Sequence, residues 1–344
     1  MATMREIALR AGTSLATVSR VLNGHQTANA AVAARVLEAA AELGYEKSKG
    51  KKLNQNLAVL VTWPSTHPTQ TLRDSQYTMM FLHSIYVAAE RLGYHLVFHF
   101  GTPEGKLSPF LRWEIATKQF EGALIVGSYC TMESTYVKHL RTAGIPFFHL
   151  SMPPVDADGP FSYVAVDDYA GGYRAGAHLA ELGCRRLLHI AGPKNARDAL
   201  ERQKGFLQAC RDHGLADRQI TVFQGDFHEP AGERCAEYLL KQGKLPDGIF
   251  AANDMMAIGC MRVLQRHGVR IPEDVRMVGF DDIVLAAYVE PSLTTIRVPY
   301  EALARTATEE LVRQIENPVR KTIKVRLEAE LVVRRSCGGQ AHLD

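Results

Sequence analysis

Hydrophobic residues recur at helical spacing in the first 45 residues and at strand spacing beyond residue 56. In the N-terminal part, segments 4–11, 15–22 and 30–43 each place apolar side chains on one face. From residue 57, short apolar runs alternate with amphipathic stretches such as 76–92, which Gly93 ends. The pattern predicts an all-α N-terminal module followed by an α/β region, in which helices cover both faces of parallel sheets.

Local signals define the ends of the first two helices. Thr3 is placed to cap the first helix, and Glu6 completes a capping box. Gly12 suits a chain reversal that needs positive φ, and Ser14 is placed to cap the second helix. The three positions that a helix-turn-helix constrains most are occupied by Ala8, Gly12 and Val18.

The exposed face of the second helix carries side chains suited to DNA. In a helix-turn-helix this helix enters the major groove, where Arg20 could donate two hydrogen bonds to guanine. Leu15 or Ala16 could contact a thymine methyl group. Short side chains suited to phosphates accompany them, namely Thr17, Ser19 and Asn23. Taken alone, a two-helix pattern fits a solvated surface hairpin equally well.

In the α/β region, polar residues follow several predicted strands. These strands are 57–61, 95–100, 123–126, 146–150, 187–191, 248–251 and 276–279, too many for one ordinary sheet, so two lobes are expected. Open α/β sheets bind ligands outside the carboxyl ends of their strands, where Ser151, Asn253 and Asp281 stand. Asn253, and Asp281 or Asp282, could instead cap the helices that follow.

Charge and composition narrow the class of protein. The 344 residues exceed one compact core, and 46% hydrophobic with 22% charged residues is typical of a globular protein. Residues 1–56 hold eight basic against four acidic side chains, which places the excess positive charge where a phosphate backbone could use it. Because the chain shows neither a signal peptide nor a long apolar run, we expect a cytoplasmic protein with no membrane partner.

Patterns for metal, cofactor or catalytic chemistry are missing from the sequence. The six cysteines are scattered without a C-x-x-C pair, and solvated or singly hydrogen-bonded imidazoles are the expected state of the histidines. No G-x-S-x-G elbow, P-loop or Rossmann fingerprint occurs. The sequence therefore predicts no cofactor, no metal site and no enzyme activity.

The segment T-S-L-A-T-V-S-R-V-L-N-G (13–24) resembles the lactose-repressor and galactose-repressor family (LacI/GalR). The resemblance implies a DNA-binding domain at 1–45. It implies base contacts by Leu15, Ala16 and Arg20. It implies contacts to the DNA backbone by Thr3, Ser14, Thr17, Ser19, Asn23 and Tyr45.

The rest of the chain resembles the periplasmic-binding-protein-like sensor of the same family, through V-D-D-Y-A-G-G (166–172), R-Q-K-G-F (202–206), A-N-D-M-M-A-I-G (252–259), G-F-D-D (279–282) and P-S-L-T-T-I-R (291–297). It implies an effector-binding and dimerisation domain at 57–344. The implied N-lobe is about 57–161 plus 292–319, and the C-lobe about 162–291 plus 320–340. Arg202, Asn253 and Asp281 match effector contacts. Phe227 matches an aromatic residue that stacks on the ligand, although a core phenylalanine is an equal alternative.

Three segments depart from the family pattern. Ser151 stands where sugar-binding relatives often carry Asp. The linker 46–56 lacks the usual Pro and alanines and carries four lysines, so a flexible tether is expected, with Leu53 either a minor-groove wedge or packed on the sensor. The long loop 62–75, with Trp63 and His67, either covers the cleft or decorates the surface.

These observations predict a dimeric, ligand-responsive repressor that binds a palindromic double-stranded DNA operator. The expected effector is a sugar or sugar derivative of carbohydrate metabolism, and a nucleobase or other small molecule acting as corepressor is the alternative. A solute-binding protein or a DNA-tethered enzyme fits the sequence less well.

Overall fold

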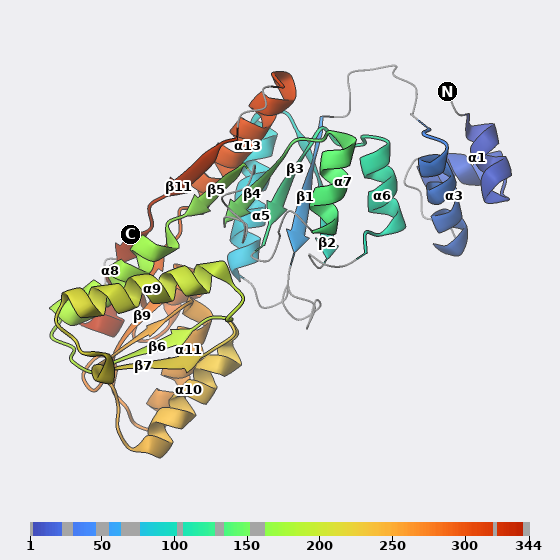
Figure 1. Cartoon of the computed structure of the whole chain (residues 1–344). Helices are drawn as coiled ribbons and strands as arrows, with labels where there is room; N and C mark the ends of the chain where they lie inside the picture. Colours follow the sequence, from blue (N-terminus) through green and yellow to red (C-terminus); the bar gives the residue numbers. More distant parts are fainter. Residues whose placement is uncertain are drawn as a thin grey trace.

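The computed structural model describes residues 3–22, 30–45, 55–62, 76–101, 106–127, 134–151, 162–318 and 322–339. The chain forms a small helical module and two α/β lobes, which follow one another along the molecule (Figure 1). The linker 46–54, the loop 63–75 and Asn23 lie outside the described residues, so the predictions for Leu53, Trp63 and His67 do as well.

The N-terminal module consists of α1 (Met4–Ala11), α2 (Leu15–Leu22) and α3 (Ala30–Glu42). Thr3 caps α1 in the predicted capping box with Glu6, and Gly12 ends the helix at φ 60°. The three helices bury one small apolar cluster, which includes Ile7, Val18 and Val36. The predicted helical module is confirmed, and its small core depends on few side chains.

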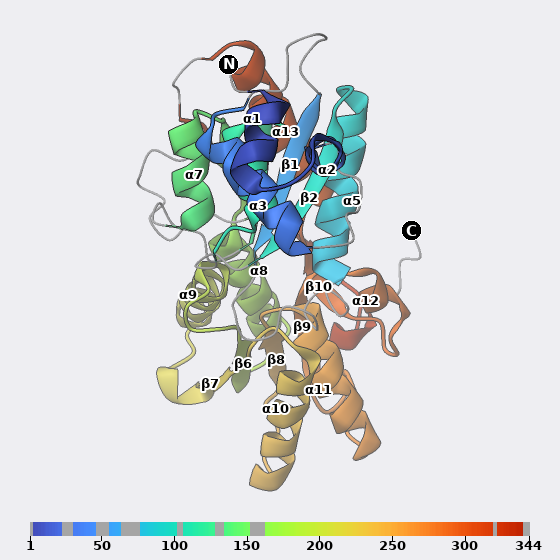
Figure 2. The same cartoon turned by 90° about the vertical axis from the view of Figure 1, so that its right-hand side faces the viewer.

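The first lobe is built on a parallel six-stranded sheet in the order β11-β5-β4-β3-β1-β2. Its strands are β1 (Asn56–Thr62), β2 (His95–Gly101), β3 (Gly122–Val126), β4 (Phe147–Ser151), β5 (Tyr163–Val166) and β11 (Lys324–Leu327). Helices α6 (Pro109–Ala116) and α7 (Thr135–Ala143) cover one face, and α5 (Gln76–Arg91) and α13 (Tyr300–Glu316) cover the other. Figure 2 shows this lobe above the second.

The second lobe repeats the arrangement in the order β12-β10-β9-β8-β6-β7, with β12 antiparallel. Its strands are β6 (Leu187–Ala191), β7 (Ile220–Gln224), β8 (Gly248–Ala251), β9 (Arg276–Asp281), β10 (Thr294–Arg297) and β12 (Glu330–Val332). Its helices are α8 (Asp168–Glu181), α9 (Arg197–Asp212), α10 (Glu229–Gln242), α11 (Asp254–Arg266) and α12 (Val284–Tyr288). Successive residues of a strand point to opposite faces of the sheet. Leu187 packs with α8 and α9 on one face, and Leu188 packs with α10 and α11 on the other.

The sheet pairing corrects the predicted lobe boundaries. β5 extends the first lobe to Val166, β10 lies in the second sheet, and β11 lies in the first. The chain therefore crosses between lobes after β5, between β10 and α13, and between β11 and β12. Three crossings side by side form the kind of hinge that lets two lobes rotate as rigid bodies.

Candidate effector site and DNA-binding surface

Arg202 occupies the centre of a buried polar cluster in the second lobe. The residue lies on α9 and is 3% exposed. Its Nε donates to Oδ1 of Asp168 at 2.9 Å, and its Nη1 donates to the carbonyl of Ala252 at 2.7 Å and, more weakly, to Oδ1 of Asp281 at 3.5 Å. α8, α9 and the ends of β8 and β9 thus meet around one guanidinium group.

Two aromatic rings flank this guanidinium group. The ring of Phe280 lies 3.6 Å from Cζ of Arg202, a stacking contact, and the ring of Phe227 lies at 5.8 Å. Gly192 makes room for the second ring, since a Cβ there would lie 2.5 Å from Phe227. Phe227 also packs against the core of the second lobe, which is the packing role that the sequence offered as the alternative, and stacking on a ligand stays a prediction.

Burial favours the neutral form of the two carboxyl groups. It raises the pKa of Asp168 to about 7, although Arg202 acts in the opposite direction. Burial likewise raises the pKa of Asp281 well above its ordinary value. Burial opposes the charge of Arg202, but Asp168 and then Asp281 outweigh it, so the pKa of the guanidinium is raised. The cluster combines a permanent cation with two carboxyl groups that can accept or donate hydrogen bonds.

The backbone is strained where these side chains converge. Four described residues other than glycine have positive φ, and three of them are Phe227 at 70°, Asp281 at 116° and Asp282 at 56°. Such conformations cost about 1–3 kcal/mol each and concentrate at ligand-binding sites. Asp281 and Asp282 are not helix caps: Asp281 accepts from Arg202, and Asp282 pairs with Arg297 and Arg334, each at 2.7 Å.

Asn253 joins helix α11 to the loop that carries Phe227. Its side-chain oxygen accepts from the backbone N–H of Met256 at 3.0 Å, which caps α11. Its amide nitrogen donates to the carbonyl of Phe227 at 2.8 Å. The capping alternative from the sequence therefore holds, and the same side chain also fixes the position of Phe227.

Replacing Asn253 separates these two contributions. We expect Asn253→Ala to lower the free energy of unfolding by about 1–2 kcal/mol, because α11 loses its cap. Asn253→Ser keeps a capping oxygen but is too short to reach Phe227, so it should recover most of the stability without recovering effector affinity. Chemical denaturation and ligand titration of both variants would measure this, and full recovery of both properties by serine would contradict the role given to the amide.

First-lobe residues reach the cluster from the opposite side. Tyr300, at the start of α13, donates to the carbonyl of Asp281 at 3.1 Å, and its ring lies 5.8 Å from that of Tyr77 on α5. The backbone N–H of Leu285 donates to Gln76 Oε1 at 3.4 Å. Ser151 ends β4 in the first sheet, and its side chain is not described. The cluster thus adjoins the boundary between the lobes.

Of the predicted effector residues, the structure brings together Arg202, Phe227, Asn253 and Asp281. Sequence reasoning missed Asp168, Phe280 and Tyr300, which contact Arg202 or Asp281. Asp168 and Phe280 stand inside the marker segments V-D-D-Y and G-F-D-D. Those segments were the available signal, but spacing alone does not tell which of two adjacent carboxylates points inward.

Helix α2 presents the predicted base-contacting residues at the surface. Leu15 is 45% exposed, and Ala16 and Arg20 are exposed as well. An exposed large aliphatic side chain and an exposed arginine on the same short helix suit a surface that a DNA groove covers.

The predicted phosphate contacts differ in their surroundings. The Ser14 and Thr17 hydroxyls lie 2.9 Å apart, and Oγ of Ser14 also accepts from the backbone N–H of Thr17 at 3.1 Å. Thr3 is exposed, and Ser19 is half-buried. Tyr45 is 7% exposed and belongs to the apolar core of the module, so its ring has a packing role.

The described residues give three further results. They contain no group of three His, Cys, Asp or Glu side chains placed to hold a metal ion. Five cysteines in this part of the chain are buried and free. None of the described helices is both long and apolar enough to span a membrane.

The chain matches two protein families. Residues 3–48 match the bacterial regulatory proteins of the lacI family, and residues 177–337 match the periplasmic binding protein-like domain. The HTH-type transcriptional regulator CelR of Thermobifida fusca is 30% identical over 336 residues, which cover 97% of this chain and 98% of that protein. The HTH-type transcriptional repressor PurR of Haemophilus influenzae is 31% identical over 344 residues, or 98% of each.

Solved structures give the same result. A CelR–cellobiose complex superposes with a TM-score of 0.72 at 29% identity and covers 98% of this chain and all of that one. The lac repressor dimer bound to operator and the anti-inducer ONPF reaches a TM-score of 0.67 at 23% identity over 98% of this chain and 99% of that one, which supports the fold alone. With relatives this similar along its whole length, the chain belongs to the LacI family of bacterial regulatory proteins and is a ligand-responsive, DNA-binding transcriptional regulator.

Proposed function

We propose that the protein is a homodimeric repressor of carbohydrate-metabolism genes, whose effector is a sugar or sugar derivative bound beside Arg202. Binding there shifts the arrangement of the lobes and thereby changes the spacing of two DNA-binding modules on a palindromic operator. Leu15, Ala16 and Arg20 contact bases. Thr3, Ser14, Thr17, Ser19, Asn23 and Tyr45 contact the backbone, the last through its hydroxyl.

The observation that carries this proposal is the buried Arg202 cluster. Guanidinium donors next to carboxyl acceptors can bind both ends of a vicinal diol, and the ring of Phe227 offers an apolar face to the carbon skeleton. Ser151 and Asn253 complete the proposed effector contacts. The solved complex of CelR with cellobiose supports a sugar as the effector, and the similarity to the transcriptional repressor PurR supports repression.

A nucleobase remains the second candidate because of the aromatic residues. Tyr77 and Phe227 supply rings on both sides of the lobe boundary, and a flat heterocycle could stack on them while Arg202 and Asp281 pair with its edge. Such a ligand would act as a corepressor.

A screen on the full chain separates the two effector classes. We expect a sugar or sugar acid to raise the melting temperature and, in a second assay, to change operator affinity, whereas nucleobases do neither. Stabilisation by a nucleobase alone would overturn the sugar assignment. A chain that binds no defined duplex at low salt would overturn the assignment of α2.

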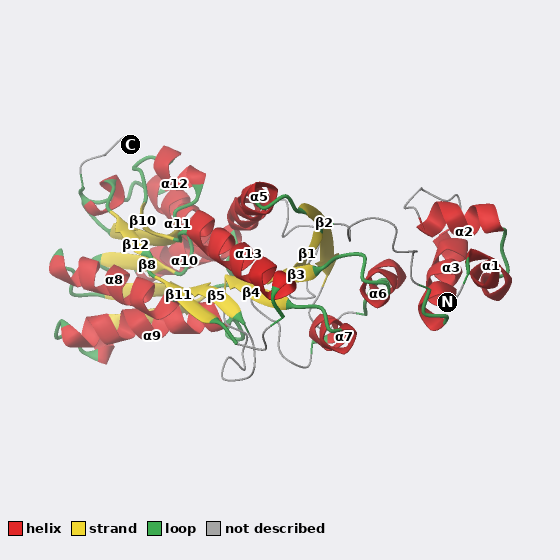
Figure 3. Ribbon diagram, turned by 90° about the horizontal axis from the view of Figure 1, so that it is seen from above, coloured by secondary structure: helices red, strands yellow, loops and turns green. Residues whose placement is uncertain are grey.

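Exposed hydrophobic side chains support the homodimer. Phe98 and Phe100 on β2 are 39% and 46% exposed, Tyr86 on α5 is 50% exposed, and Tyr288 on α12 is 81% exposed. Figure 3 shows α5, β2 and α12 on one side of the molecule, and Figure 2 agrees. Apolar residues gathered on one side indicate a surface that another protein covers, and paired half-sites require two copies.

We expect Phe100→Asp combined with Tyr288→Asp to convert dimers to monomers and to weaken operator binding strongly, because a buried unpaired charge opposes the contact. Leu9→Asp is the control for oligomeric state, since Leu9 is 87% exposed but lies on α1 of the DNA-binding module. Analytical ultracentrifugation would measure the oligomeric state of both variants. A double variant that is still a dimer would mean that the interface lies elsewhere.

A further inference from the structure

Helix α6 presents apolar side chains on two opposite faces. Leu111 and Ile115 lie one helical turn apart and pack into the first-lobe core together with Val137 and Leu140 of α7. Trp113 lies two residues from each, so it points away from that core. A surface helix normally carries polar side chains on that outer face.

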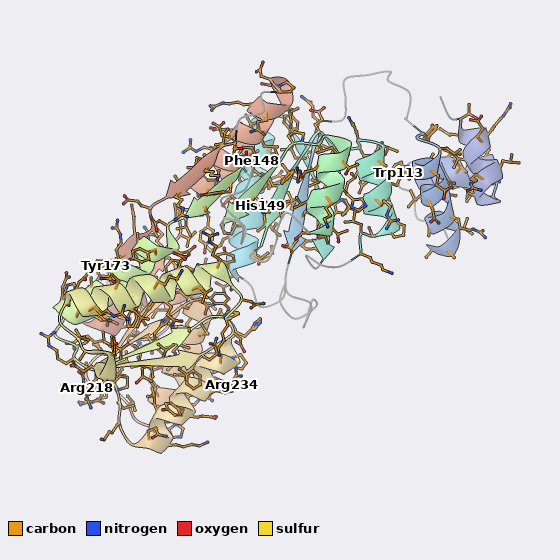
Figure 4. All side chains as sticks on the ribbon, in the orientation of Figure 1. Trp113, Phe148, His149, Tyr173, Arg218 and Arg234 are labelled. Carbon is orange, nitrogen blue, oxygen red and sulfur yellow. The ribbon has the colours of Figure 1, made fainter. Side chains whose placement is uncertain are left out.

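Trp113 is nevertheless buried, because the DNA-binding module covers it. It is 3% exposed and belongs to the same apolar cluster as the core residues of the module. Among the described helices of the module, α3 makes the most extensive contact with α6. Figure 4 labels Trp113 on the side of α6 that faces the module, and Figure 3 shows α6 between α3 and the first sheet.

The composition of α3 suits a close helix–helix contact. Seven of its thirteen residues are alanine, which lets a neighbouring helix and a large indole ring approach the backbone closely. The indole N–H of Trp113 has no hydrogen-bond acceptor within the described part of the chain, so apolar contact holds the ring in place. Phe110, 5.8 Å from Trp113 and 39% exposed, extends the same face.

The contact leaves the recognition helix free. Leu15 is 45% exposed, and Ala16 and Arg20 are exposed, while α3 lies against α6. The docked module therefore presents its base-contacting side chains and does not hide them. A contact that served to block DNA binding would cover α2 instead.

We propose that the outer face of α6, formed by Trp113 and Phe110, is a docking site for the DNA-binding module of its own chain and sets the orientation of that module on the sensor. This inference rests on the proposed function, because it needs two modules on one operator. Docking makes each module part of the first lobe, so a lobe rotation moves the recognition helix directly. It also supplies the orientation that the lysine-rich linker, without the usual Pro and alanines, would otherwise have to provide.

The test uses the full chain and an operator selected from random duplexes. We expect Trp113→Ala to lower operator affinity by about tenfold, because two loosely tethered modules lose the advantage of preorganisation. The variant should also tolerate one or two base pairs inserted between the half-sites, which the wild type should not. Affinity for a duplex with a single half-site should stay unchanged. Arg112→Ala, an exposed neighbour on α6, is the matched control.

A second measurement does not depend on the variant folding well. With Trp63, the other tryptophan, replaced by phenylalanine, Trp113 in the otherwise intact chain should resist quenching by acrylamide. Ready quenching, unchanged affinity and spacing preference in Trp113→Ala, or tighter operator binding by that variant would each overturn the docking proposal. A wild type that binds one half-site as tightly as two would instead overturn the dimeric function on which it rests.

Discussion

Arg202→Ala should abolish the effect of the ligand on operator affinity while the ligand-free protein still binds its operator. Arg202 holds Asp168 and Asp281 together and stacks on Phe280, so its loss removes the donors that a ligand would use. The DNA-binding module makes none of these contacts. The coupling between ligand and DNA in such regulators is typically about 1–3 kcal/mol, and all of it should disappear. Operator titrations with and without the effector would measure the loss.

The same substitution should destabilise the sensor in a pH-dependent way. Removing one partner of a buried ion pair costs about 3–5 kcal/mol. The carboxyl groups left behind can lower this cost by binding protons, and burial already raises the pKa of Asp168 to about 7. A carboxyl group whose pKa is raised by folding stabilises the native state below its unfolded-state pKa, and this contribution is lost as the pH rises through the folded-state value. Loss of Arg202 removes the charge that lowers the pKa of Asp168, so the pKa in the variant lies above the wild-type value of about 7. The variant should therefore regain melting temperature, relative to wild type, as the pH falls from the alkaline range towards about 7, and the difference should change little at lower pH, where the wild-type carboxyl group also binds its proton.

A matched control lies on the same helix. Arg211 of α9 is 52% exposed and pairs with Asp217 at 3.4 Å, so Arg211→Ala should leave both the ligand response and the stability nearly unchanged. If Arg202→Ala kept a full response, the ligand would have to bind elsewhere. If the variant lost operator binding while its sensor stayed folded, the assignment of DNA binding to the module and of ligand binding to the sensor would be wrong.

The helical module was predictable because its signals are local. Thr3, Glu6 and Gly12 act within one or two turns of helix α1, and the structure places them as the sequence indicates. The predicted strands were found where apolar runs are continuous. β7 was missed because it is an edge strand with largely exposed residues, and β10 was missed because its sequence, T-T-I-R, has no continuous apolar run. The short strands β5, β11 and β12 were missed as well.

Contacts between distant segments set the limit of the prediction. Asp168 meets Arg202 across 34 positions, and the carbonyl of Ala252 meets it across 50. The positive φ of Phe227 belongs to a residue that rarely adopts it, so propensity argues against it. Trp113 is buried by α3, which belongs to a different domain. The hydrophobic pattern within α6 does not show which neighbour covers its outer face.

Arg20→Ala should weaken specific operator binding by about 1–3 kcal/mol and relax the preference at one base pair of each half-site. The side chain is exposed on α2, and its planar guanidinium edge carries two donors that match the acceptors of guanine. Competition binding against a set of single-base operator variants would measure both effects. The stability of the module should stay close to that of wild type, because Arg20 is not part of its core.

Thr17→Val provides the contrast that identifies a base contact. A hydroxyl that binds phosphate positions the protein without reading sequence, so its loss should weaken binding to all operator variants by a similar factor. Loss of the Arg20 contact should instead reduce the affinity differences among operator variants at one base-pair position, and the differences at the other positions should stay unchanged. If Arg20→Ala weakened every duplex equally and reduced the salt dependence by about one charge, Arg20 would be a phosphate contact, and base recognition by α2 would have to depend on Leu15 and Ala16.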